Sequence, residues 1–305
     1  MKRVTVIAGQ GSQNYGEKLT YMQVSEILKD KAMEFITPMT LHDALKSIRT
    51  SNGIIFAGRR VRNGVDALDV VNLALELEKP VFLFGVELGD MGKTGLKRFS
   101  TSLMSPLVSG FLTDAPSVKW ALFWSKRKIE VGADLAHIYL LNHVKRKKAK
   151  YAVFAPRIMG TLHKYKEYNW FPKVDVRIIV ANPMDSSIAV EVSRHVKTDE
   201  IVILSDAEDI MDTVANAKFV VSERFHVSLT AESFGVPFIH IGRRAMRYFG
   251  EKFIDNFSIP DDVEVALTFS KLSDEIPSFY SDFNNEVQIR YERMLKELER
   301  FLLLI

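Results

Sequence analysis

The chain has 305 residues, of which 47% are hydrophobic, which is enough for two domains of ordinary size, each with its own core. The formal net charge of +3 is too small to indicate a nucleic-acid-binding protein, and the absence of cysteine excludes disulfide bonds, thiolate catalysis and cysteine-ligated zinc. The N-terminal residues run directly into a strand-like stretch without a long apolar segment, so we expect no signal peptide, no membrane span and a cytoplasmic location.

The first part of the chain alternates apolar strands with helices. Residues 4–8 predict a buried strand, residues 9–16 a loop that carries three glycines, and residues 17–28 a helix. This order is typical of the start of nucleotide-binding α/β domains, although the glycine spacing is not that of the dinucleotide fingerprint. A strand at 53–57, a helix at 66–78 and a strand at 80–84 continue the pattern.

Three charged segments of this region have two interpretations each. Arg59, Arg60 and Arg62 follow the strand at 53–57, where they either line an anion site or solvate a loop; charge runs usually do the latter. Asp134 stands at the end of a strand expected from residue 129, where it either faces the cleft or caps the short helix that follows; capping is the commoner role of such an Asp. The basic run 143–150 predicts a solvated connector, and the alternative is attraction to an anionic membrane or lipid-linked sugar.

The second half repeats the alternation. Strands are expected at 151–157, 175–181 and 200–204, and helices at 185–196 and 207–215, with the spacing of roughly 20–30 residues that a doubly wound sheet requires. We therefore expect two domains, residues 1–145 and 146–305. Residues 285–304 predict a terminal helix whose apolar side chains share one face; these are Val287, Tyr291, Leu295, Leu298 and Leu302.

Residues 216–241 form the most informative segment. Two apolar runs, 219–221 and 237–241, bracket a predicted helix at 227–234, which gives the strand–helix–strand unit of a parallel sheet. Ser222 is a suitable N-cap, and Gly235 followed by Pro237 is a stop signal.

Two cationic side chains stand at the start of this helix. Arg224 and His226 would face the positive end of the helix dipole, an unfavourable position unless an anion is shared. One interpretation is a binding site for carboxylate or phosphate at the carboxyl edge of the sheet. In the other, Arg224 pairs with Glu223 or Glu232, and His226 is a packed, hydrogen-bonded histidine. The residues alone leave both open.

The stretch SERFHVSLTAESFGVPFIHIG resembles the signature of the polysaccharide pyruvyl transferase family, a strand followed by Ser-x-Arg-Leu-His, a helix of small residues, Gly-hydrophobic-Pro and a second strand. Phe225 replaces the usual Leu. Residues 14–17 are similar to the family's Asn-x-Gly-Asp/Glu turn, residues 113–117 to its Arg-Asp-x-x-Ser stretch with Thr113 for Arg, and residues 134–136 to its Asp-Pro-Ala with Leu135 for Pro.

The resemblance implies an α/β fold of two Rossmann-like domains with a cleft between them, similar to GT-B glycosyltransferases. It places the acceptor on the first domain, the donor on the second, and a terminal helix that crosses back to the first. Family members transfer the enolpyruvyl group of phosphoenolpyruvate to two hydroxyls of a sugar, which gives a cyclic ketal and phosphate. The implied partners are phosphoenolpyruvate and a saccharide acceptor, and a lipid-linked acceptor would bring the enzyme to the inner membrane face.

The implied site follows from the charges of phosphoenolpyruvate. Arg224 and Arg157 would hold its carboxylate and phosphate, and His226 would protonate the methylene carbon or contact the phosphate. Asp134 is the candidate general base. The other residues expected to bind substrate are Ser222, Asn14, Gly16, Arg243 and Arg244, of which one of the last two would stand for a family lysine. We expect no metal and no cofactor, because no metal-ligand spacing occurs and no step needs one.

Two other functions fit the same sequence. A GT-B glycosyltransferase with a nucleotide-sugar donor would share the fold, because fold does not determine function. A non-catalytic, glycan-binding relative is the second, and it is favoured by Arg59 and Arg60 in place of family glycines and by Thr113 in place of Arg.

Overall fold

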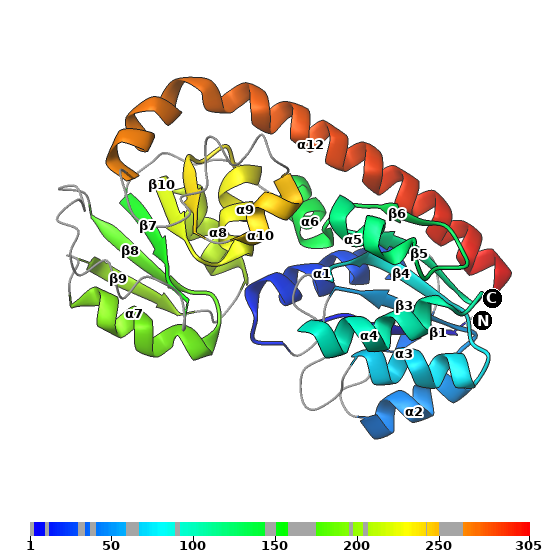
Figure 1. The fold of residues 1–305 in the computed structure, drawn as a ribbon. Coiled ribbons are helices and arrows are strands. Elements are labelled where there is room, and N and C mark those ends of the chain that lie inside the picture. The colour runs from blue at the N-terminus through cyan, green and yellow to red at the C-terminus, as the bar shows by residue number, and fades with distance from the viewer. Residues whose placement is uncertain are drawn as a thin grey trace. The chain divides into compact units, whose positions relative to one another are not determined.

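The computed structural model describes residues 3–9, 12–29, 34–36, 41–58, 67–88, 92–143, 151–157, 175–194, 198–203, 207–241, 243–249 and 265–305 (Figure 1). The chain forms two compact units. The first contains residues 1–12, 16–139 and 286–305, and the second contains residues 13–15 and 140–285. The loop with Arg59, Arg60 and Arg62 and the basic run from residue 144 to 150 lie outside the described residues.

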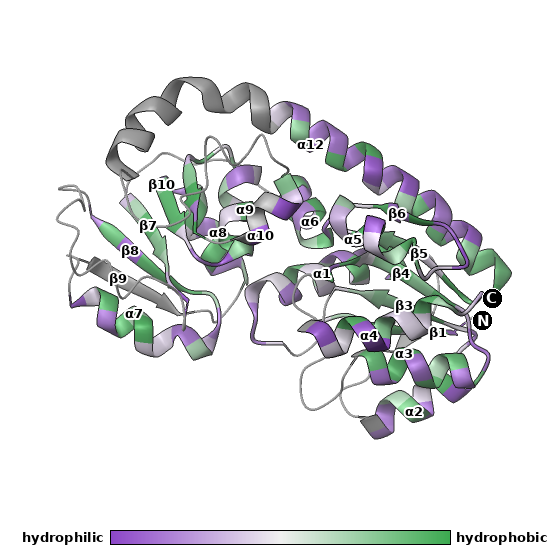
Figure 2. Cartoon of the chain, viewed as in Figure 1, coloured by the Kyte–Doolittle hydropathy of each residue, from purple (hydrophilic) through white to green (hydrophobic). Residues whose placement is uncertain are grey.

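The first unit is built on a parallel sheet of six strands in the order β2-β1-β3-β4-β5-β6. Its strands are β1 (Arg3–Ile7), β2 (Glu34–Ile36), β3 (Gly53–Ala57), β4 (Val81–Val86), β5 (Val108–Leu112) and β6 (Ile129–Val131). The strands expected at 4–8, 53–57 and 80–84 are confirmed to within two residues. They were predictable because a strand buried on both faces is an almost unbroken apolar run, which Figure 2 shows as green arrows.

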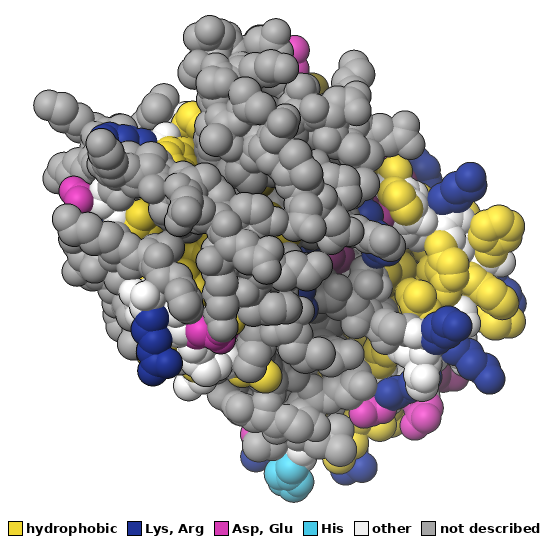
Figure 3. Space-filling view, turned by 60° about the vertical axis from the view of Figure 1, so that its left-hand side comes forward, with side chains coloured by type: hydrophobic (Ala, Val, Ile, Leu, Met, Phe, Trp, Pro, Cys, Tyr) yellow, Lys and Arg dark blue, Asp and Glu magenta, His cyan; other side chains and the backbone are white. Residues whose placement is uncertain are grey.

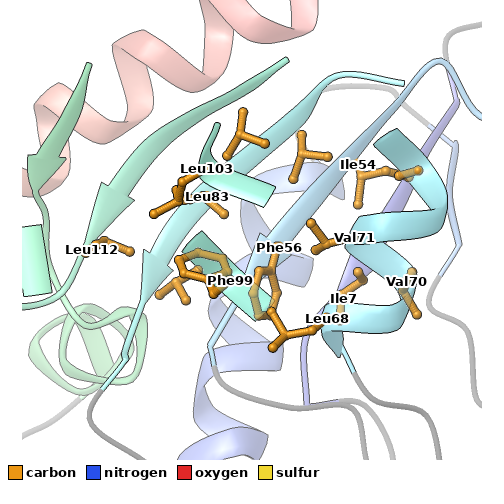
Figure 4. Close-up of a cluster of buried hydrophobic side chains, with 14 of the residues drawn as sticks. Ile7, Ile54, Phe56, Leu68, Val70, Val71, Leu83, Phe99, Leu103 and Leu112 are labelled. Carbon is orange, nitrogen blue, oxygen red and sulfur yellow. The ribbon is translucent and has the colours of Figure 1, made fainter. Parts of the chain in front are cut away.

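Helices cover both faces of this sheet. They are α1 (Tyr15–Lys29), α2 (Leu41–Thr50), α3 (Ala67–Glu76), α4 (Gly92–Leu103), α5 (Ala115–Ala121), α6 (Leu135–His143) and the last part of α12 (Val265–Leu304). On one face, side chains of β1, β3, β4 and β5 pack against α2, α3, α4 and α5 to form the core of Figure 4. Leu83 of β4 belongs to this core, whereas its neighbours Phe82 and Phe84 point to the opposite face, as alternation along a strand requires.

The last turns of α12 pack on that opposite face. The ring of Phe301 stacks on Phe82 with centroids 5.3 Å apart, and the hydroxyl of Tyr291 accepts a hydrogen bond from Gln23 Nε2 at 2.9 Å. The expectation that the terminal helix crosses back to the first unit is confirmed. Leu295 of the expected face is half-buried, and Met294, which the expected face did not include, is fully buried.

The second unit has a parallel sheet in the order β11-β10-β7-β8-β9. Its strands are β7 (Tyr151–Ala155), β8 (Val176–Val180), β9 (Thr198–Ile203), β10 (Ala217–Ser222) and β11 (Phe238–His240). They are joined by the 3₁₀ turn η2 (Pro183–Asp185) and by α7 (Ser186–Ser193), α8 (Ala207–Ala215) and α9 (Phe225–Ser233), and α10 (Arg243–Phe249) follows β11.

This strand order has a switch point. The chain adds β8 and β9 on one side of β7 and then returns to add β10 and β11 on the other. At such a point the loops after two neighbouring strands diverge, and open α/β sheets bind ligands in the crevice beyond their carboxyl ends. The segments after β7 and β10 therefore mark the place to look for a site.

The surface carries described hydrophobic side chains as well as charged ones. On the face shown in Figure 3, hydrophobic side chains gather at the right, with Lys and Arg beside them. None of the helices that the structure describes is both long and apolar enough to cross a bilayer.

Candidate functional site

The turn between β10 and α9 is shaped by Ser222. Its Oγ accepts a hydrogen bond from the Arg224 N–H at 2.9 Å and donates to the Arg224 carbonyl oxygen at 2.8 Å. The helix begins at Phe225, so Arg224 occupies the N-cap position, and no described side chain caps it. The prediction of Ser222 as N-cap was wrong, because this serine closes a tight turn around Arg224 instead.

The other end of α9 follows the sequence signal. Gly235 has φ of 62°, its N–H donates to the Glu232 carbonyl, and the Val236 N–H donates to the Ala231 carbonyl at 2.8 Å. These two bonds are a Schellman motif, which needs a residue that adopts positive φ without strain. Most side chains of α9 are buried, so the helix start is fixed at the carboxyl edge of the sheet.

The guanidinium of Arg224 pairs with Asp185. Its Nε donates to Asp185 Oδ2 at 2.6 Å, and Nη2 donates to Oδ1. Asp185 is fully buried at the end of η2, directly after β8, whereas the Arg224 side chain is 18% exposed. Both acids suggested by the sequence were wrong partners, since the fold brings a carboxylate from the 3₁₀ turn η2 to this position.

This geometry leaves Arg224 able to bind an anion. A guanidinium has five N–H groups, and within the described part of the chain two of those of Arg224 point at Asp185, which leaves three for another acceptor. The two-bond contact also fixes the plane of the guanidinium. Arg224 is therefore a preoriented donor beside the start of α9.

Arg157 lies at the same edge. It follows β7, and its N–H donates to Glu223 Oε2 at 3.0 Å, while the Glu223 N–H donates to the Ala155 carbonyl at 3.0 Å. Glu223 thus ties the ends of β7 and β10 together across the switch point. The side chain of Arg157 is exposed. The two arginines proposed from the sequence therefore follow adjacent strands.

His240 adds a feature that sequence reasoning missed. It ends β11, it is 2% exposed, and its Nδ1 lies 2.9 Å from Ser228 Oγ. Burial, and then the positive charges of Arg244 and Arg157, lower the pKa of His240 to about 3. The ring is therefore neutral at physiological pH. Because the charges of Arg157 and Arg244 both lower the pKa of His240, both guanidinium groups lie near the end of β11.

Arg244, on α10, contacts Phe225, the first residue of α9. Its guanidinium lies over the ring of Phe225, 4.3 Å from the ring centroid. The Phe that replaces the family's usual Leu therefore supplies a cation–π surface. Arg243 begins α10, and its side chain lies outside the described residues.

His226 and the loop before α1 complete the set in the second unit. His226 is half-buried in the first turn of α9, and its ring meets Phe225 edge-on at 5.2 Å. Asn14 precedes Tyr15, whose N–H donates to the Ala181 carbonyl at 3.1 Å and whose hydroxyl is 2.9 Å from Thr230 Oγ1. This brings residues 13–15 to α9, a connection that no sequence signal indicated.

The first unit holds the remaining predicted residues. The buried Asp134 accepts a hydrogen bond from the Ala136 N–H at 2.9 Å, so it caps α6 as the commoner interpretation had it. The Gly16 carbonyl accepts a hydrogen bond from Thr20 Oγ1 at 3.0 Å, which leaves Gly16 inside the first turn of α1. Among the described residues, no group of three or more His, Asp or Glu side chains is placed to hold a metal ion.

The sequence model of the polysaccharide pyruvyl transferase family matches residues 68–244, which is more than half of the chain. The chain belongs to the polysaccharide pyruvyl transferase family. The matched segment includes Asp134, Arg157, the β10–α9 turn and Arg244, whereas Asn14 and Gly16 precede it. Arg157, Arg224 and Arg244 thus all lie within the residues that match the family model.

Solved structures give the fold. The transferase is similar to S. aureus MnaA in complex with UDP, with 12% identity, a TM-score of 0.61 and 100% and 98% of the two chains covered. UDP-GlcNAc 2-epimerase from Neisseria meningitidis bound to UDP-GlcNAc is similar over 100% of both chains, with 13% identity and a TM-score of 0.61. Anabaena HepE in complex with UDP is also similar over 100% of both, with 10% identity and a TM-score of 0.60. The expected α/β fold of two Rossmann-like domains, similar to GT-B enzymes, is confirmed. No curated protein matches the sequence.

Proposed function

We propose that this transferase moves the enolpyruvyl group of phosphoenolpyruvate onto a sugar of a cell-surface polysaccharide or its precursor and forms a pyruvate ketal. The observation that carries the proposal is the family match over the β10–α9 turn. Arg224 in that turn keeps three N–H groups for a ligand beside a helix start without a side-chain cap.

The donor explains the charges at this edge. Phosphoenolpyruvate has a carboxylate and a phosphate, and planar guanidinium groups bind both through paired hydrogen bonds. We assign one anionic group to Arg224 and the start of α9, where backbone N–H groups and the helix dipole favour an anion. Arg157 and Arg244, whose charges both lower the pKa of His240, are assigned to the other anionic group of the donor.

His226 is the proposed acid. It donates a proton to the methylene carbon of the donor, which becomes a methyl group, and the adjacent carbon becomes an oxocarbenium ion. A sugar hydroxyl attacks that carbon and loses its proton to a base, for which we propose Asp134. A second hydroxyl then forms the other C–O bond of the ketal as the bond to phosphate breaks, and its proton passes to the phosphate that leaves.

Calorimetric titration with phosphoenolpyruvate tests the donor. We expect binding in the micromolar to low-millimolar range, lost in Arg224→Ala and weakened about tenfold or more in Arg157→Ala, because each removes a charge-assisted contact. Arg194→Ala is the matched control, since Arg194 is an exposed arginine that follows α7, and it should bind like the parent.

The same titration separates the alternatives. If the folded parent protein binds UDP-sugars and not phosphoenolpyruvate, it is a nucleotide-sugar enzyme and the proposal is wrong. If phosphoenolpyruvate binds, release of phosphate with a panel of saccharide acceptors distinguishes a transferase from a non-catalytic binding protein. His226→Asn should then retain binding and lose phosphate release.

A further inference from the structure

A turn in the first unit exposes three large hydrophobic side chains in succession. Directly after α5, Leu122, Phe123 and Trp124 have relative exposures of 56%, 79% and 44%. Single exposed hydrophobic residues are ordinary on protein surfaces, but a continuous group that includes two aromatic rings usually marks an interaction site.

The turn that presents them is held by hydrogen bonds. The N–H groups of Trp124 and Ser125 both donate to the Ala121 carbonyl at 2.9 Å, and Ser125 Oγ donates to the Arg127 carbonyl at 2.6 Å. The Trp124 ring lies 6.5 Å from the ring of Trp120, which packs against the core. The exposure of these side chains is therefore fixed by the fold.

Positive charges surround this turn. Lys119, Lys126, Arg127 and Lys128 are all exposed. The Lys126 N–H donates to the Leu103 carbonyl at 3.4 Å, which brings Met104, 50% exposed, to the same place. Glu130 is a nearby acid, and Lys128 Nζ lies 2.6 Å from its Oε1. We call residues 104, 119 and 122–128 the aromatic-basic patch.

We propose that the aromatic-basic patch binds the surface of an anionic lipid bilayer. Aromatic side chains favour the interfacial zone of a bilayer, and lysine and arginine are attracted to its negative surface potential. A protein partner fits less well, because a stable interface engages about 20–30 residues on each side, whereas this patch, as defined from the described residues, has nine.

The position of the patch is compatible with a working site. It precedes β6, so it lies at the amino edge of the first unit's sheet, as the order of α5 and β6 in Figure 1 shows. Gly16 and Asp134 follow strands of that sheet and lie toward its carboxyl edge. Contact of the patch with a bilayer therefore leaves these two predicted site residues of the unit uncovered.

Flotation of the full chain with vesicles tests the proposal. We expect binding to vesicles of phosphatidylcholine with about 30% phosphatidylglycerol, weak binding to phosphatidylcholine alone, and loss of binding at high salt. Phe123→Ser with Trp124→Ser should weaken binding about 100-fold, and Lys126→Gln with Arg127→Gln about 25-fold, because each cation near such a surface contributes about fivefold.

Matched controls keep the result specific. Ile289→Ser removes an exposed hydrophobic side chain of α12, and Lys46→Gln removes an exposed lysine of α2; both should bind vesicles like the parent. Fluorescence of Trp124 should shift to shorter wavelength with anionic vesicles, and Trp124→Phe should abolish the shift.

Three results would overturn the proposal. The parent protein could fail to bind anionic vesicles, or the patch variants could bind as the parent does. Sedimentation could also show a dimer that dissociates in Phe123→Ser, in which case a second copy of the chain occupies the patch. The patch variants should bind phosphoenolpyruvate normally, so failure here is distinct from failure of the proposed function.

Discussion

Two strand-to-helix turns of this protein solve the same electrostatic problem in opposite ways. At the turn from β6 to α6, Asp134 caps the helix and places a carboxylate at its positive end. At the turn from β10 to α9, the corresponding position holds Arg224, with no described side-chain cap. The start of α6 thus obtains its negative charge from its own N-cap residue. The second turn obtains its carboxylate from Asp185 in the 3₁₀ turn η2 that follows β8, and the exposed part of the guanidinium still faces outward. A cation at a helix start is thus stable when a buried anion orients it.

At neutral pH, removal of that buried anion should have the largest effect on stability. Asp185→Ala leaves the Arg224 guanidinium without its partner, and we expect a loss of about 3 kcal/mol in the free energy of unfolding. Urea denaturation measures it. In the double variant with Arg224→Met the loss should be smaller, because no uncompensated charge remains. Equal losses in the single and double variants would show that Asp185 acts through packing alone.

The pH dependence of stability tests a second feature of the second unit, the buried His240 at the end of β11. The pKa of His240 is lowered from 6.5 to about 3 in the folded protein, so between these values the unfolded chain binds more protons. The contribution of neutral His240 is complete above pH 6.5 and is lost as the pH falls toward 3, by up to about 1.4 kcal/mol per pH unit. In His240→Asn the denaturation midpoint should fall less steeply over this range. A parallel decline in both proteins would contradict the assignment.

Ser222→Ala tests whether the second turn depends on its serine. The substitution removes the acceptor of the Arg224 N–H and one donor to its carbonyl, and we expect a loss of about 1.5 kcal/mol. The affinity for phosphoenolpyruvate should also fall, because Ser222 no longer holds the backbone of Arg224 in this turn. Ser193→Ala is a suitable control, since that serine is partly exposed and bonds within its own helix.

Asp134→Ala should have the smallest effect on stability. Loss of one helix cap costs about 1 kcal/mol, and phosphoenolpyruvate binding should not change. Asp134→Asn restores most of the cap because asparagine caps nearly as well. If Asp134 is also the base, phosphate release stays low in Asp134→Asn although stability returns; recovery of both would limit this residue to capping.

The sequence predicted what local patterns encode. Strands buried on both faces gave apolar runs, Gly235 marked the end of α9, and the helix-dipole argument singled out Arg224 and His226. Asp185 could not be found in this way, because it lies 39 residues before Arg224 in the chain and no local pattern connects them. The low pKa of His240 could not be predicted for the same reason. It depends on burial and on the charges of Arg244 and Arg157, which belong to separate parts of the chain.

The Ser222 error has a different cause. Serine is favoured both as an N-cap and as the first residue of a tight turn, and the two positions differ by one or two residues. Periodicity cannot fix a helix start to that precision.

The return of α12 to the first unit has a consequence for biosynthesis. Phe82 and Gly53 are made early, yet the side chains that cover them, Phe301 and Ile305, belong to the last turn of the chain. While the second unit is being synthesised, one face of the first sheet stays without this covering helix and exposes aromatic rings to other nascent chains. The first unit to leave the ribosome therefore cannot complete this face until residues 286–305 emerge.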